Sequence, residues 1–141
     1  MNYTINNTIS YKDYCALREA VNWRKVSERQ FESGLKHSHY IAVLKENDTA
    51  IGLIKAVGDM GYYWVLADLI VHPDYQGQGL GRKLVEGFLQ FADDSLEKGE
   101  NVFISLLSAK GKESFYEKFG FKTRPYGDMY GAGMSIHYEK S

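Results

Sequence analysis

Three closely spaced glycines and the two basic residues that follow them form the stretch with the clearest chemical meaning. Gly77, Gly79 and Gly81 are followed directly by Arg82 and Lys83. They stand where an apolar strand pattern changes to an amphipathic helical pattern, which predicts the start of a helix. Free N–H groups and the positive end of the helix dipole gather at such a start, and glycine lets an anion approach the backbone closely. The stretch therefore predicts a binding site for a phosphate-like anion.

The spacing of these residues excludes two common phosphate-binding loops. A dinucleotide fingerprint has glycines in the order G-x-G-x-x-G, whereas here they alternate as G-x-G-x-G. A nucleoside-triphosphate loop has Gly-Lys followed by Ser or Thr, but Gly81 precedes Arg82 and Lys83. We therefore expect a ligand of another class.

Two motifs resemble the GNAT superfamily of acetyl-CoA-dependent N-acetyltransferases. Gln76, Gly79 and Gly81 match the defined positions of its Q/R-x-x-G-x-G/A signature. Residues 71–75 (V-H-P-D-Y) resemble the usual V-x-P-x-Y/F lead-in to that signature. Residues 115–121 (F-Y-E-K-F-G-F) resemble the F-Y-x-K-x-G-F segment of the same superfamily.

Acetyl-CoA is the cosubstrate that this resemblance implies. In the family, the strand corresponding to the one that ends at Ile70 and Val71 pairs with the pantetheine arm, and the next strand splays away to leave room for it. Backbone N–H groups then hold the pyrophosphate. Where related enzymes often carry an asparagine facing the arm, this chain has Ala109, and we expect the Ser108 hydroxyl or a backbone group to substitute. The expected cofactor-binding residues are Ile70, Val71, Gln76, Gly77, Gln78, Gly79, Leu80, Gly81, Arg82 and Ser108.

Tyr116 resembles the family tyrosine that protonates the leaving sulfur after a neutral amine attacks the thioester. A phenol with an ordinary pKa near 10 is still protonated at neutral pH and able to donate. A strand-end N–H near Val71 is expected to stabilise the oxyanion. The alternative is that Tyr116 only packs within its aromatic segment.

Asp68 is the candidate general base, because it is a charge inside an otherwise apolar strand pattern. Some family members carry Glu or His on this strand, at positions that Ala67 and Val65 hold here. Asp68 is therefore predicted to act as the base or to contact the substrate. A structural hydrogen-bonding role remains the alternative.

The elements around these residues predict an α/β fold. We expect a GNAT-type mixed, mostly antiparallel sheet flanked by helices, in which strands 62–71 and 102–107 form a parallel, splayed pair that holds the cofactor. Helices are predicted at residues 11–21, 28–39, 80–98 and 112–119, with Ser10 and Ser27 as the caps that precede the first two. The other predicted strands are residues 3–9, 40–44, 51–57 and 132–138.

Composition limits the class of protein. The 141 residues suit one domain, 1–141, with a formal net charge of −1, so no basic excess favours a nucleic-acid partner. Cys15 is the single cysteine, which excludes an intrachain disulfide, and no metal site is expected. The start of the chain lacks a signal-peptide pattern, and no apolar run approaches the length of a membrane span. We expect a cytoplasmic protein without a membrane partner.

The sequence thus predicts an enzyme that transfers the acetyl group of acetyl-CoA to the primary amine of a small molecule. Residues 131–134 (G-A-G-M) resemble arylalkylamine-type members, which favours the small-amine branch. Specificity is expected from residues 23–38 and 124–133. A protein or peptide acetyltransferase, and a non-catalytic acyl-CoA sensor, remain alternatives, and a homodimer is left open.

Overall fold

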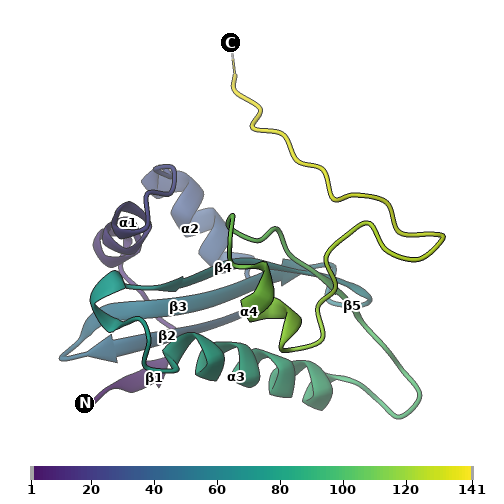
Figure 1. The fold of residues 1–141 in the computed structure, drawn as a ribbon. Helices are drawn as coiled ribbons and strands as arrows, with labels where there is room; N and C mark the ends of the chain where they lie inside the picture. Colours follow the sequence, from purple (N-terminus) through teal and green to yellow (C-terminus); the bar gives the residue numbers. More distant parts are fainter. Residues whose placement is uncertain (1, 141) are drawn as a thin grey trace. The chain divides into compact units, whose positions relative to one another are not determined.

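The computed structural model describes residues 2–140, and the chain divides into two compact units at Leu107. The first unit runs to Leu106 and contains all the strands, and the second contains one short helix (Figure 1).

A five-stranded sheet forms the centre of the first unit. Its strands follow one another in sequence order, β1-β2-β3-β4-β5, and all neighbours are antiparallel except the parallel pair β4 and β5. The predicted GNAT-like α/β sheet with one parallel pair is confirmed. The strands are β1 (Thr4–Asn6), β2 (Tyr40–Glu46), β3 (Thr49–Gly58), β4 (Tyr63–Val71) and β5 (Phe103–Ser105).

Helices cover both faces of this sheet. α1 (Tyr11–Ala20) and α2 (Glu28–Lys36) lie on one face, and α3 (Leu80–Ser95) lies on the other (Figure 1). The polar residues before the first two helices set their starts: Ser10 accepts from the Asp13 N–H, and Ser27 forms a capping box with Gln30. The predicted helix starts at Tyr11 and after Ser27 are therefore confirmed.

The core has a layer on each face of the sheet. Under α1 and α2, the cluster joins Leu17 and Phe31 to strand residues that include Leu53 and Ile70. On the α3 face, the ring of Phe88 lies 6.1 Å from the ring of Trp64, and Val85 and Phe88 are fully buried. The apolar face of α3 is thus buried against the sheet, and this packing holds the start of the helix close to the end of β4.

Three predicted strands differ from the structure, and the one expected at residues 102–107 covers only Phe103–Ser105. The first strand covers only Thr4–Asn6, and Ile9 is buried beyond its end. The prediction of a strand at residues 132–138 is wrong, because the described residues after Leu107 contain α4 (Glu113–Glu117) and no strand. Met134, Ile136 and Tyr138 alternate as in a strand but are 83–91% exposed. Alternation alone does not form a strand when no neighbouring strand pairs with its backbone.

Candidate active site

The middle of β4 contains a bulge at Ala67. Ala56 of β3 pairs with Leu66 and the adjacent Lys55 pairs with Asp68, so Ala67 lies between two paired positions. The extra residue reverses which alternate side chains of β4 point to which face of the sheet. Trp64, before the bulge, packs on α3, whereas Ile70, an even number of residues later, joins the cluster under α1 and α2. Asp68, the first residue after the bulge, therefore faces the α1 side.

The parallel pairing of β4 and β5 ends just before this bulge. Val65 and Ser105 form the last pair, while β4 remains paired with β3 as far as Val71. Among the described residues, the backbone of residues 66–71 has no β5 partner on that edge. This is the splay that the sequence predicts. The His72 N–H donates to the Ile51 carbonyl, so the Val71–Gly52 pair is a non-hydrogen-bonded pair of the β3–β4 ladder. The Val71 N–H therefore faces the free edge and is available to an extended ligand, whereas the peptide groups of Ile70 face β3.

A glycine-rich turn connects the end of β4 to α3. The chain passes through the short helix η1 (Pro73–Tyr75) and then through Gly77 and Gly79, which have φ angles of 79° and 80°. A side chain at either glycine would have no heavy atom within 4 Å, so both face open space. The left-handed backbone explains why glycine is present, and the open space allows a ligand to approach the backbone.

The start of α3 has free backbone donors. Gly79 is the N-cap and provides no side-chain hydrogen bond, and the first bond into the cap runs from the Lys83 N–H to the Gly79 carbonyl at 3.1 Å. In this described segment, the N–H groups of Leu80, Gly81 and Arg82 precede that bond and have no side-chain acceptor. Leu80 is buried, which anchors the helix end in the core.

Two cations lie next to these donors. Arg82 pairs with Glu86 at 2.6 Å, and its side chain is 74% exposed. The Lys83 ammonium donates to the Tyr3 hydroxyl at 2.8 Å. Exposed ion pairs contribute little to stability, so Arg82 is free to exchange Glu86 for a ligand phosphate.

Gln76 stabilises the turn itself. Its side-chain Nε2 donates to the Val71 carbonyl at 2.9 Å, and its backbone N–H donates to Pro73 at 3.3 Å. The Gln76 N–H is therefore used within the turn itself, and the assignment of Gln76 to the cofactor stays a prediction. The row of available donors starts after Gln76, in a segment where Gln78 is exposed.

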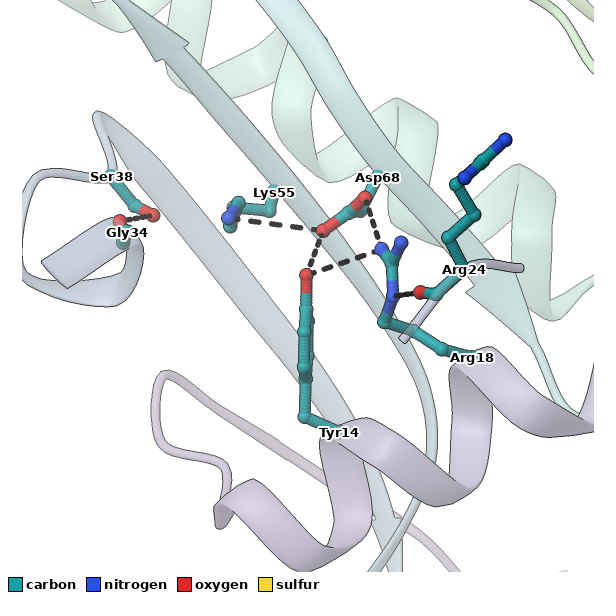
Figure 2. A network of polar contacts seen from close by, with 7 residues as sticks. All are labelled: Tyr14, Arg18, Arg24, Gly34, Ser38, Lys55 and Asp68. Carbon is teal, nitrogen blue, oxygen red and sulfur yellow. Dashed lines mark hydrogen bonds and ion pairs between the residues drawn. The ribbon is translucent and has the colours of Figure 1, made fainter. Parts of the chain in front are cut away.

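Asp68 lies at the centre of a buried polar network and is 6% exposed. Its Oδ2 accepts a hydrogen bond from the Tyr14 hydroxyl at 2.8 Å and lies 3.8 Å from the Lys55 ammonium. Its Oδ1 lies 3.6 Å from the Arg18 guanidinium. Figure 2 shows these side chains converging from α1, β3 and β4.

The network also reaches the segment after α1. Arg18 Nε donates to the Arg24 carbonyl, an interaction drawn in Figure 2, at 2.8 Å. The Arg18 guanidinium also lies 5.5 Å from the centre of the Trp23 ring. Burial, together with the nearby charge of Asp68, raises the pKa of Tyr14 to about 12, so its hydroxyl remains a donor.

Tyr14, Arg18 and Lys55 were not predicted from the sequence as partners of Asp68. A signal existed for the first two, since Tyr14 and Arg18 stand four residues apart and share one face of α1. Lys55 gave a weaker signal, as a cation within an apolar strand pattern.

The remaining candidates lie in the second unit. Ser108 donates its hydroxyl proton to the Ala109 carbonyl at 2.8 Å, so its donor is used locally. Tyr116 lies on α4, where its ring packs edge-on against Phe115 at 5.1 Å. Burial raises the pKa of Tyr116, which keeps the phenol protonated at neutral pH. Their assignments to the cofactor and to acid catalysis stay predictions.

No group of three or more His, Cys, Asp or Glu side chains is arranged to hold a metal ion in the described part of the chain. In residues 2–140, no helix combines the length and apolar character that crossing a membrane requires.

Comparison with known proteins identifies the family. Residues 37–123 match the family model described as Acetyltransferase (GNAT) domain. An uncharacterized N-acetyltransferase, ycf52, from Porphyra purpurea is 31% identical over 115 residues, which cover 79% of this chain and 64% of the relative. A histone acetyltransferase, TAP1, from Glycine max is 26% identical over 136 residues, which cover 89% of this chain and 57% of the relative. This chain thus spans roughly three fifths of the length of these relatives.

A solved structure agrees with this result along nearly the whole chain. A probable acetyltransferase of unknown function, SA2161, from meticillin-resistant Staphylococcus aureus superposes with a TM-score of 0.83 at 28% identity. The match covers 97% of this chain and all of the other. The glycine-rich turn, the splayed β4–β5 pair and the family match all lie in one continuous segment, and the chain belongs to the GNAT family of acetyltransferases.

Proposed function

We propose that this chain transfers the acetyl group of acetyl-CoA to the primary amine of a small molecule. The observation that supports this most is the combination of a splayed β4 edge with an uncapped, glycine-rich helix start at one end of the same strand. One feature suits an extended amide-bearing arm and the other suits a pyrophosphate, and acetyl-CoA contains both.

The residues present fit this cosubstrate. Open space at Gly77 and Gly79 lets a pyrophosphate reach the N–H groups at the start of α3, and Arg82 supplies a compensating charge. Peptide groups at Leu69 and Val71, which alternate with those of Ile70 and face the free edge, would hold the pantetheine arm in the manner of an added strand. When bound, acetyl-CoA supplies an acetyl group activated as a thioester.

The chain's own groups divide the remaining chemistry. A backbone N–H at the free β4 edge is suited to stabilise the oxyanion. Tyr116 is suited to protonate the leaving sulfur, because burial keeps its phenol protonated. Val65 and Ala67 stand where some family members carry a Glu or His base, and neither side chain is able to take a proton. The acceptor amine is therefore deprotonated by water or by another group, or it reacts from its free-base fraction.

A panel of amines tests the proposal. Free thiol release from acetyl-CoA should depend on an added small amine and follow saturation kinetics. Peptides ending in a free α-amine, and histone peptides with lysine, belong in the same panel because the soybean relative is named a histone acetyltransferase. Turnover of peptides alone would replace the small-amine proposal by a protein or peptide acetyltransferase. Binding of acetyl-CoA without turnover of any amine would indicate an acyl-CoA sensor.

A further inference from the structure

We propose that Asp68 is a positioning residue that couples the segment after α1 to the bulge of β4, rather than the base that takes the amine proton. The inference rests on the proposed function, because the bulge borders the strand edge assigned to the acetyl-CoA arm. Tyr14, Arg18 and Lys55 are the other members of this coupling, and we call the four side chains the Asp68 network.

The position of Asp68 in β4 is the first argument. The bulge at Ala67 falls between the last β4–β5 pair, formed by Val65 and Ser105, and the part of β4 that has no β5 partner. Asp68 is the next residue, and Lys55 is both its cross-strand partner and one of its cations. Bulges aim peptide groups and locally weaken a ladder, so side-chain contacts beside a bulge help to fix its geometry.

Charge balance is the second argument. A carboxylate that is 6% exposed needs partners that replace its lost hydration, and Arg18 and Lys55 supply two cations. The Tyr14 hydroxyl supplies the one short hydrogen bond, at 2.8 Å. Loss of the Asp68 charge would leave two largely buried cations without their counter-ion, so the network is held as a unit.

The Asp68 network also connects two parts of the chain with different expected roles. Arg18 holds the Arg24 carbonyl through Nε and approaches Asp68 through a terminal nitrogen. Residues 23–38 are the segment from which we expect acceptor specificity. A single guanidinium thus joins that segment to the carboxylate beside the bulge, which couples the expected acceptor side to the cosubstrate side.

The same contacts argue against proton transfer to Asp68. Both carboxylate oxygens already face donors or cations from α1 and β3. An amine would have to displace the Tyr14 hydroxyl or a cation to reach them. Proton transfer requires direct hydrogen-bond contact or one bridging water.

Amide hydrogen exchange of the whole chain tests the coupling without any substrate. In Asp68→Asn, protection should fall at two separated places together, the bulge residues 66–69 and the segment 21–26, while α3 keeps its wild-type protection. Tyr11→Phe is the matched control, because it removes another hydroxyl of α1, the one that donates to Val26 at 2.6 Å, without touching Asp68. In that variant we expect unchanged exchange at residues 66–69. Loss at only one of the two places in Asp68→Asn would overturn the coupling.

Kinetics with one good amine separates positioning from base catalysis. We expect Asp68→Asn to lower kcat by roughly tenfold to a hundredfold, the scale of a misplaced reacting group, with acetyl-CoA affinity within about threefold of wild type. The acidic limb of the pH–rate profile should persist in the variant. Disappearance of that limb would identify Asp68 as the base and contradict the proposal.

A second, milder variant keeps the test valid if Asp68→Asn does not fold. Tyr14→Phe keeps all charges and should reproduce the exchange changes and the kcat loss in smaller measure, and the two substitutions together should cost less than the product of their separate effects. Independent effects would contradict a shared network. If wild type binds acetyl-CoA but acetylates nothing, the proposed function fails while the exchange result still decides the coupling.

Discussion

The two functional regions of β4 are built in opposite ways. At its C-terminal end, the turn to α3 exposes backbone N–H groups, with glycines facing open space and no side-chain cap. In its middle, Asp68 is buried and surrounded by side chains from α1 and β3. The first region is suited to grip a ligand, and the second is suited to hold the strand in place.

This difference predicts different responses to mutation. A site made of backbone N–H groups loses its affinity when the local φ angles change, because all of its N–H donors are then reoriented together. A buried charge network loses stability and alignment when one member is removed, because the others are left unpaired. Substitutions in the turn should therefore act on affinity, and those in the network on turnover and stability.

The largest effect is expected at the turn. Gly79→Val should weaken acetyl-CoA binding by about a hundredfold or more, because a branched side chain strains a φ of 80° and misdirects at least two charge-assisted donors. Isothermal titration calorimetry on the folded variant measures this. Gly99→Val is the matched control, since Gly99 has a φ of 91° with open space in the loop after α3. Equal losses in both variants would show that strain alone, and not the turn, controls affinity.

The next effect concerns the second unit. Tyr116→Phe should reduce kcat by about a hundredfold while acetyl-CoA affinity stays the same, since only a proton donor is removed. Because burial raises the pKa of Tyr116, wild-type kcat should fall on the alkaline side only above the ordinary tyrosine range. Tyr138→Phe, at an 87% exposed tyrosine, serves as the control and should keep wild-type turnover. Wild-type turnover in Tyr116→Phe would return Tyr116 to a packing role.

A smaller effect is expected at the surface cation of the turn. Arg82→Ala should weaken acetyl-CoA binding by about threefold to tenfold, with the loss shrinking at high salt, because an exposed charge acts through a screened field. Glu86→Gln removes the competing carboxylate, which lies 2.6 Å from Arg82 Nε. Binding in that variant should be unchanged or slightly tighter. A loss in Arg82→Ala that is independent of salt would contradict the electrostatic role.

The sequence predicted the turn well because its determinants are local. Gly77, Gly79 and the amphipathic pattern after Leu80 report a helix start within a few residues, and the structure shows that start at Leu80. The Asp68 network depends on partners up to 54 residues away in sequence, as in the Tyr14–Asp68 hydrogen bond. The charge of Asp68 signalled that partners must exist, but only the bulge at Ala67 determines which face it occupies. The strand predicted at residues 132–138 failed for a related reason, since strand formation depends on a neighbour that local alternation does not reveal.

The smallest effect is expected at Tyr14, in the pH dependence of the unfolding free energy. Burial first, and then the charge and hydrogen bond of Asp68, raise the pKa of Tyr14 from 10.0 to about 12 in the folded state. The unfolded chain therefore loses this proton first as pH rises. The stabilisation is fully present below about pH 10 and is lost as pH rises toward about 12.

Urea unfolding across this range should thus show a steeper fall in the unfolding free energy of wild type than of Tyr14→Phe. Other tyrosines with raised pKa values, such as Tyr40 and Tyr75, are common to both proteins and cancel in the difference. Repeating the pair in an Asp68→Asn background should shrink that difference, because one cause of the shift has been removed while burial remains. An undiminished difference would mean that burial alone controls Tyr14, and that the Asp68 network is weaker than its geometry indicates.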